Sequence, residues 1–370
     1  MRGINGRVTF AAIAAVGALA LAGCGDDESS DSGGSASSSD GGTKAAKIAL
    51  LLPETKTARY EAQDKPLFEA KMKSLCPNCE VIYSNADQDA SKQQQQAEAA
   101  ITNGAKVLVL DPVDSASAGS IVNRAKQSKI PVISYDRLIT GAPVDYYISF
   151  DNEQVGKLQA ESLLKALGGS NKPIVMINGA PTDNNAKLFK KGAHSVLDGK
   201  VDIKKEYDTP DWSPDKAQSQ MEQAITSAGK DGFDGVYAAN DGTAGGAIAA
   251  MKGAGVDPSS KPTTGQDAEV AGVQRILAGE QYMTVYKAIK PEAEQAAELA
   301  FALSQGKEPR AGLVNAKTDN GSGQVDSVIL KPVAVTKDNI NDTVIKDGVL
   351  EPSEICTGQF AELCSGAGIG

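Results

Sequence analysis

The sequence predicts an α/β fold made of two doubly wound lobes. From residue 47 onward, apolar runs typical of buried strands alternate with helical patterns, which indicates parallel sheets with right-handed crossovers. The strands also divide into two sets near Phe150. Two sheets of ordinary size suit a chain of 370 residues better than one oversized sheet.

The two sets of elements follow one another along the chain. In the first set, strands are expected at 47–52, 80–84, 106–110, 131–135 and 146–150, with helices ending near 75 and covering 90–103 and 115–128. In the second set, strands are expected at 173–177, 201–207, 234–239, 262–266 and 282–286, with helices at 152–167, 186–197, 214–228, 243–253 and 268–278. A helix over 291–304 and a strand-like run over 327–335 complete the pattern.

The N-terminal residues predict a processing signal. Arg2 and Arg7 precede an apolar run over 8–21, which is too short for a membrane-spanning helix. The run ends in Leu21-Ala-Gly-Cys24, which resembles a bacterial lipoprotein box. This resemblance implies a signal peptide over 1–23 and a lipid on the sulfur of Cys24, whose two acyl chains suffice for stable anchoring. A plain secretory signal is the alternative.

Residues 24–45 are rich in Ser, Gly and Asp. Such a segment cannot bury enough apolar surface to offset the entropy lost on ordering, so we expect a flexible tether between the membrane and the folded part.

The four remaining cysteines form two local pairs, Cys76 with Cys79 and Cys356 with Cys364. Outside the cytoplasm, disulfides are the default, so we favour two structural disulfides with these pairings. A zinc site made of all four cysteines stays open as an alternative. A redox-active Cys76-Pro-Asn-Cys79 is weaker, because this pair follows a predicted helix and does not open one.

The composition excludes several classes of function. The formal net charge of -10 argues against a nucleic-acid partner. The run Asn240-Asp-Gly-Thr-Ala-Gly-Gly lacks the G-x-G-x-x-G spacing of a dinucleotide site, and there is no Walker A sequence. His194, the only histidine, does not support a catalytic triad. We therefore expect no cofactor, no metal and no catalytic residue.

Polar and aromatic side chains stand just past the ends of the predicted strands. Because the carboxyl ends of parallel strands meet at one edge of a sheet, two facing lobes would line a single cleft with these groups. Carboxylates accept hydrogen bonds, Arg and Lys donate them and Asn does both, which suits the hydroxyls of a sugar. Taken singly, these residues could be helix caps, core residues or surface ion pairs. The candidate ligand-binding residues are Arg59, Tyr60, Asp136, Arg137, Asp183, Asn185, Trp212, Asn240, Asp267 and Lys287.

Several runs also resemble a known family. They are Tyr135-Asp-Arg137, Tyr147-Ile-Ser-Phe-Asp-Asn-Glu153, Asp183-Asn-Asn-Ala-Lys-Leu-Phe189, Asn240-Asp-Gly-Thr-Ala-Gly-Gly-Ala247, Gly265-Gln-Asp-Ala268 and Met283-Thr-Val-Tyr-Lys287. Over roughly 47–348, the chain is similar to the periplasmic D-xylose-binding proteins, which are type I substrate-binding proteins of ABC sugar importers.

The resemblance implies two Rossmann-like lobes joined by three hinge crossings, near 149–151, 282–286 and 327–333. The N-terminal lobe would comprise 46–149 plus about 287–327, the C-terminal lobe 150–286 plus about 328–354, and 355–370 would form an extension. The lobes would close on a monosaccharide by hinge bending, with the ten candidate residues as its ligands. The family implies an extracytoplasmic, non-enzymatic monomer that delivers its sugar to the permease subunits of an ABC transporter.

Two alternatives remain at this point. Tyr60 stands where the family commonly has Trp, and 51–60 and 265–282 also resemble the multiple-sugar-binding relatives. A receptor for several monosaccharides, which also serves a chemosensory or signalling partner, is therefore one alternative. A glycosidase that uses paired carboxylates such as Asp183 and Asp267 is the other.

Overall fold

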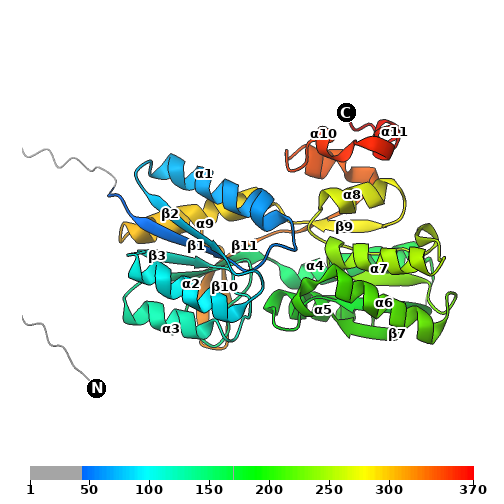
Figure 1. Cartoon of the computed structure of the whole chain (residues 1–370), viewed down its shortest axis with the longest axis horizontal. Coiled ribbons are helices and arrows are strands. Elements are labelled where there is room, and N and C mark those ends of the chain that lie inside the picture. The colour runs from blue at the N-terminus through cyan, green and yellow to red at the C-terminus, as the bar shows by residue number, and fades with distance from the viewer. Residues whose placement is uncertain (1–43, 170) are drawn as a thin grey trace, which may run out of the picture. The chain divides into compact units, whose positions relative to one another are not determined.

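The computed structural model describes residues 44–169 and 171–370. The predicted signal peptide, Cys24 and almost all of the predicted tether lie outside these residues. Thr43–Gly370 form one compact unit. Its strands form separate sheets, and these sheets define two lobes (Figure 1). The first lobe is built on a seven-stranded sheet, and the second on a three-stranded and a two-stranded sheet.

The first lobe has the strand order β10-β11-β5-β4-β3-β1-β2. The pairs are parallel except for β10 with β11, and the strands are β1 (Lys47–Leu52), β2 (Glu80–Asn85), β3 (Val107–Leu110), β4 (Val132–Tyr135), β5 (Tyr146–Phe150), β10 (Ala316–Asp319) and β11 (Gln324–Leu330). Helices cover both faces, which explains why the central strands are continuous apolar runs. Helices α1 (Lys65–Leu75) and α9 (Ile289–Ser304) lie on one face, and α2 (Ala90–Thr102) and α3 (Gly119–Gln127) on the other (Figure 1).

The second lobe has a parallel sheet of order β7-β6-β8 and a separate antiparallel pair, β9 with β12. These strands are β6 (Lys172–Asn178), β7 (Val201–Asp208), β8 (Gly235–Ala238), β9 (Met283–Tyr286) and β12 (Val333–Thr336). One face carries α4 (Asn152–Leu167) and α5 (Asn184–Leu197), the other α6 (Pro214–Ala228) and α7 (Asp241–Gly253), and α8 (Val270–Leu277) packs near β9.

The chain passes between the lobes three times: from β5 to α4, from β9 to α9 and from β11 to β12. The predicted fold class, two doubly wound lobes joined by a three-crossing hinge, is confirmed. The residue boundaries given above for the lobes stay a prediction, because residues 43–370 form a single compact unit.

The predicted strand over 262–266 is wrong. Thr263 makes only an isolated bridge to Val236. Pro262 has no N–H to donate to a ladder. The Thr264 hydroxyl accepts from the backbone N–H of Ala238 and donates to its carbonyl, both at 2.9 Å. Pro262 and Thr264 still make backbone hydrogen bonds with Val236, but at Ala238 a side chain replaces the backbone pairing that would continue the strand.

The predicted run over 327–335 also differs from the structure. Strand β11 ends at Leu330 and β12 begins at Val333, and the two belong to different sheets. Pro332 falls between them, where a residue without an N–H interrupts the pairing. The sequence also gives no sign of β10, because Ala316–Asp319 lacks an apolar alternation.

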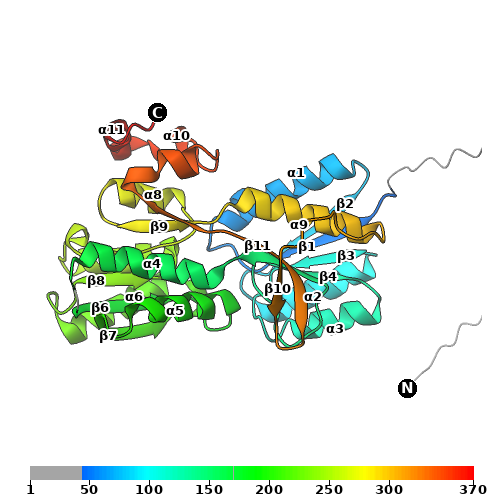
Figure 2. The same cartoon turned by 180° about the vertical axis from the view of Figure 1, so that it is seen from behind.

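The C-terminal residues pack on the second lobe. Helices α10 (Pro352–Ile355) and α11 (Ala361–Gly366) lie beside α8 in Figure 2, and Ile355 and Ile369 join the apolar cluster around Leu277. A disulfide joins Cys356 to Cys364, one of the two pairings that the sequence favours. The extension is therefore a packed part of the second lobe.

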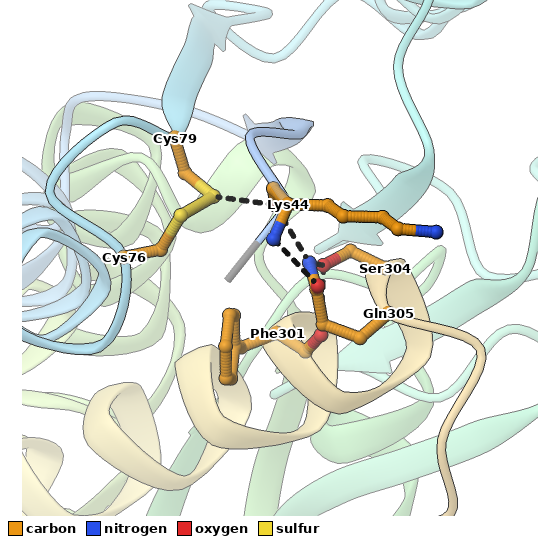
Figure 3. Close-up of a disulfide and its surroundings, with 6 residues drawn as sticks. All are labelled: Lys44, Cys76, Cys79, Phe301, Ser304 and Gln305. Atoms are coloured by element: carbon orange, nitrogen blue, oxygen red, sulfur yellow. Dashed lines mark hydrogen bonds between the residues drawn. A yellow bond between two sulfur atoms is a disulfide. The ribbon is translucent and has the colours of Figure 1, made fainter. Parts of the chain in front are cut away.

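The second disulfide lies where the described chain begins. Cys76 is bonded to Cys79 in the turn between α1 and β2, and the sulfur of Cys79 lies 4.0 Å from the carbonyl oxygen of Lys44 (Figure 3). The Gln305 side chain, at the end of α9, accepts from the backbone N–H of Lys44 at 3.2 Å and donates to its carbonyl at 2.9 Å. The described chain thus enters the first lobe at the amino end of β1, opposite the carboxyl ends of the parallel strands.

Candidate functional site

The structure brings all ten sequence-predicted residues into one pocket of about 290 Å³, including space open to solvent. None of the ten is more than 7% exposed. Three further residues line the same pocket: Thr57, Phe189 and Gln266. This space is small, so in the closed arrangement the pocket suits no ligand larger than a single small ring.

Two segments at the carboxyl ends of β1 and β4 supply the wall from the first lobe. Arg59 and Tyr60 begin a helical turn after β1, and Asp136 and Arg137 follow β4 directly. Asp136 has a φ of 51°, a conformation that is rare for residues other than glycine and that tends to occur at ligand sites. The backbone turn at Asp136 directs the following chain back over the sheet edge, so both side chains reach the pocket.

Arg59 is held by three buried carboxylates. Its Nε and Nη2 bond to the two oxygens of Asp64 at 2.9 and 2.6 Å. Its Nη2 also bonds to Glu292 at 3.0 Å, and its Nη1 to Asp136 at 2.9 Å. Burial opposes the charge of Asp136, but Arg59, Lys287 and Arg137 outweigh it and lower the pKa of that carboxyl. Asp136 is therefore an ionised acceptor at the pocket.

Arg137 links the two lobes. Its Nε lies 3.0 Å from Asp183 Oδ2, and its Nη2 donates to the Tyr60 hydroxyl at 3.1 Å. Behind it lies Asp111, whose pKa is raised well above its usual range by burial although Arg137 opposes the shift. Because the Tyr60 oxygen accepts from Arg137, its own O–H stays available to a ligand.

The wall from the second lobe comes from the starts of two helices. Asp183 is the N-cap of α5 and accepts from the backbone N–H of Asn185 at 2.8 Å. Asn240 caps α7 in a capping box with Thr243. Asp183 also accepts from the indole Nε1 of Trp212 at 3.1 Å, so one carboxylate caps a helix and fixes an aromatic ring. Asp183 and Asn240 therefore both cap a helix and line the pocket.

Trp212 and Phe189 form the aromatic side of the pocket. Their rings meet edge to face, with centroids 6.3 Å apart and an interplanar angle of 62°. Trp212 packs directly on Gly179, where a Cβ would lie 2.0 Å from the ring. Only glycine at this position allows the ring to take its place, so Gly179 is part of the architecture of the site.

Lys287 follows β9, where the chain returns to the first lobe, and contacts carboxylates from both sides. Its Nζ lies 3.7 Å from Asp136 and 3.5 Å from Asp267. Asp267 has a φ of 94°, and among the described residues its Oδ1 has no hydrogen-bond partner. Oε1 of Gln266 also has no hydrogen-bond partner within residues 44–169 and 171–370. Both buried oxygens can therefore accept from hydroxyls, and the one on Asp267 is also the oxygen nearest to Lys287.

Thr57, Phe189 and Gln266 were not among the residues predicted from the sequence. Phe189 and Gln266 both fall inside runs that carry the family resemblance, which is the signal that could have identified them. The supporting carboxylates Asp64 and Glu292 were not predicted either, because they lie within predicted helices and carry no strand-end signal.

The described residues contain no group of three or more His, Cys, Asp or Glu side chains arranged to hold a metal. Within 44–169 and 171–370 there is also no helix with the length and apolar character that a membrane crossing requires.

The fold and the pocket define a class: a two-lobed binding protein with a polar pocket at facing strand ends. Residues 48–308 match the family described as Periplasmic binding protein domain. The chain is 40% identical over 317 residues to the D-xylose-binding periplasmic protein of Escherichia coli (strain K12), covering 84% of this chain and 93% of that protein. It is 35% identical over 290 residues to the multiple sugar-binding periplasmic receptor ChvE of Rhizobium radiobacter, covering 73% and 81%.

Among solved structures, the fold is similar to an ABC transporter solute binding protein from Clostridium phytofermentans with bound β-D-glucose. The TM-score is 0.75 and the identity 31%, with 84% of this chain and 99% of that chain covered. The chain therefore belongs to the periplasmic binding protein family. Its relatives are binding proteins of transport systems and not enzymes, so the glycosidase alternative for Asp183 and Asp267 is set aside.

Proposed function

We propose that this protein captures D-xylose, or a related aldose, in the pocket between its lobes and delivers it to the permease of an ABC transporter. The observation that carries the proposal is the convergence of ten strand-end and helix-start side chains, from both lobes, on one pocket. The D-xylose-binding relative, which matches most of this chain, supports the choice of sugar.

The chemistry of the pocket supports a polyhydroxylated ring. Asp136 and Asp267 accept from hydroxyls, Lys287 and the free N–H of Arg59 donate, and the pocket is buried enough to strengthen each bond. Trp212, with Phe189 and Tyr60, offers apolar faces to the C–H side of a ring. A wrong stereoisomer would leave one of these buried polar groups unpaired, which is the usual source of sugar specificity.

Capture would involve a hinge. The proposed lobes, 46–149 plus about 287–327 and 150–286 plus about 328–354, would open about the three crossings and close on the sugar. Direct contacts between the lobes, such as Arg137 with Asp183, support a closed arrangement here. In the open form these charged groups would be exposed to solvent and accessible to the ligand.

We further propose that the protein is a lipoprotein anchored through Cys24 and tethered by residues 24–45, with the folded part outside the cytoplasm. The motif Leu21-Ala-Gly-Cys24 supports this. Cell fractionation of a Cys24→Ala variant tests it: the variant should leave the membrane fraction and appear in the soluble one. Equal membrane retention of variant and wild type would contradict the anchor.

A receptor for several monosaccharides is the second candidate. The similarity to the multiple sugar-binding receptor favours it, and Tyr60 leaves a smaller ring than Trp against the sugar. Under this second proposal, the protein would also serve a chemosensory or signalling partner.

The single Trp212 provides the experiment for both candidates. Titration of purified protein with D-xylose and a panel of pentoses and hexoses should give a saturable change in its emission, because the indole lines the pocket. A response to D-xylose alone favours the first candidate, and responses to several aldoses favour the second. If no sugar changes the fluorescence or gives a calorimetric signal, both candidate functions are contradicted.

A matched pair of variants locates the site. Asp267→Asn keeps the shape of the side chain and removes the charge of a buried acceptor, so affinity should fall roughly tenfold or more. Asp231→Asn makes the same change at an exposed position of the same lobe and should leave affinity unchanged. Equal affinities for the two variants would place the sugar elsewhere.

A further inference from the structure

The crossing from β5 to α4 carries a buried ring of hydrogen bonds that ends at the pocket. Asn152, which is 3% exposed, donates from Nδ2 to Asn185 Oδ1 at 2.8 Å and to Ser149 Oγ at 3.1 Å. Its Nδ2 also lies 3.4 Å from the hydroxyl of Tyr147, which donates to the backbone oxygen of Asp136 at 3.2 Å. Asn185 closes the ring by donating from Nδ2 to the backbone oxygen and Oδ1 of Asp136, at 3.1 and 3.2 Å.

The direction of both amides in this ring is fixed from the pocket end. The carbonyl and the ionised carboxylate of Asp136 can only accept, so the NH₂ group of Asn185 must face them. The oxygen of Asn185 then faces Asn152, and only the NH₂ group of Asn152 can satisfy it. An amide flip at either residue would set two acceptors or two donors against each other.

Helix formation does not explain the side chain of Asn152. The cap of α4 is Asp151, whose carboxylate accepts from the backbone N–H of Gln154 at 2.9 Å. The Oδ1 of Asn152 has no hydrogen-bond partner among the described residues, although the residue is buried. A buried residue with an unsatisfied carbonyl persists when its other group is needed, and here that group is the donor to Asn185.

We propose that Asn152 is a positioning residue for ligand binding, which holds the Asn185 amide with its NH₂ group on Asp136. Because the Asn185 oxygen is occupied by Asn152, the NH₂ group of Asn185 stays on Asp136 and holds that carboxylate in place at the pocket wall. Tyr147 and Ser149 belong to the last strand before the crossing, and Asn185 to the second lobe. The ring therefore forms fully only when the lobes are closed, and it couples closure to the placement of the Asp136 carboxylate that the sugar meets. This inference rests on the proposed function.

The test is a double-variant cycle on sugar affinity, with the aldose that the wild type binds best. Asn152→Asp keeps the shape but sets a carboxylate against the Asn185 oxygen, so the dissociation constant should rise roughly tenfold or more. Asn152→Ala should weaken binding in the wild-type background and change it less than about twofold in an Asn185→Ala background, because its partner is absent.

A matched control separates positioning from stability. Asn341 donates two hydrogen bonds from its Nδ2, to Ala367 and Gly368, far along the chain from the pocket residues. Asn341→Asp should lower the melting temperature of the unliganded protein and leave affinity unchanged. Should Asn152→Asp not fold, the alanine cycle decides alone.

The outcomes are distinct. If the wild type binds no aldose, the proposed function fails and this inference with it. If the wild type binds and the Asn152 variants bind within twofold of it, only the inference is overturned. It is also overturned if the losses from Asn152→Ala and Asn185→Ala simply multiply, because Asn152 then acts independently of Asn185.

Discussion

At the scale of single residues, the site depends on a surplus of buried carboxylates around Arg59. Asp64, Asp136 and Glu292 all bond to this one guanidinium, and Lys287 is the other cation in contact with Asp136. Burial, and next the charge of Asp136, raise the pKa of Glu292 well above its usual range, although Arg59 opposes the shift. Glu292 is thus a carboxyl of this cluster whose charged form is disfavoured by folding.

The raised pKa of Glu292 predicts an unusual response to mutation. A carboxyl whose pKa is higher in the folded than in the unfolded state contributes stability below its unfolded pKa of about 4.3 and loses it as the pH rises. Glu292→Gln has no carboxyl to ionise and therefore does not lose this stability at high pH. The variant should equal or exceed the wild type in free energy of unfolding at pH 8. Its advantage should shrink toward pH 5. Urea unfolding at the two pH values measures both.

Asp64→Asn is the matched comparison. Both Asp64 oxygens bond to Arg59, so this variant breaks a buried, two-point ion pair and should cost about 3 kcal/mol at either pH. If Glu292→Gln were as destabilising as Asp64→Asn at pH 8, Glu292 would be an ordinary ionised partner of Arg59.

At the scale of elements, apolar runs that are buried on both faces were predictable, because each consists of Val, Ile and Leu between turn residues. Strands β1, β3, β4 and β6 belong to this group. The predicted strands over 262–266 and 327–335 were wrong for local reasons that composition does not reveal. The hydroxyl of Thr264 replaces the backbone pairing at Ala238, and Pro332 divides one apolar run between two sheets. Strand β10 is specified by pairing with β11, which is a long-range effect.

The candidate pocket residues were predictable for a related reason. In parallel α/β sheets, the position just past a strand lies at one edge whatever the rest of the chain does, so strand ends such as Asp136 and Asp267 could be placed. Other residues inside helices could not, although Asn185, near the start of α5, was among the candidates. Asn152 and Glu292 reach the site through helix starts near the crossings, and only the three-dimensional path of the chain brings them there.

At the scale of the whole molecule, contacts outside the pocket also join the lobes. Ser115 on the first lobe donates from its backbone N–H to Thr182 and accepts from the backbone N–H of Asn184, both at 3.0 Å. The backbone N–H of Ala58 donates to Glu269 at 3.4 Å. These bonds exist only while the lobes are together, so they contribute to the balance between open and closed forms.

Glu269 makes that balance depend on pH. Burial, followed by the nearby Asp241 and Asp267, raises the pKa of Glu269 to about 8. Once the lobes separate, the carboxyl meets more water and its pKa falls, although Asp241 and Asp267 lie on the same lobe and stay beside it. The closed form therefore holds the proton of Glu269 more tightly than the open form, and closure is favoured at low pH and weakens as the pH rises toward 8. We expect the dissociation constant for sugar to rise roughly tenfold between pH 5.5 and 8.

Glu269→Gln, an uncharged shape match that keeps an oxygen for the Ala58 N–H, should flatten this dependence. Glu222→Gln, at an exposed position on α6, should retain the wild-type slope. Calorimetric titrations across the pH range measure all three proteins. A slope that survives in Glu269→Gln would assign the proton to another group of the cleft, with Glu292 next to be tested. No slope in the wild type would mean that Glu269 has the same pKa in the open and the closed form, and hence that closure does not desolvate it.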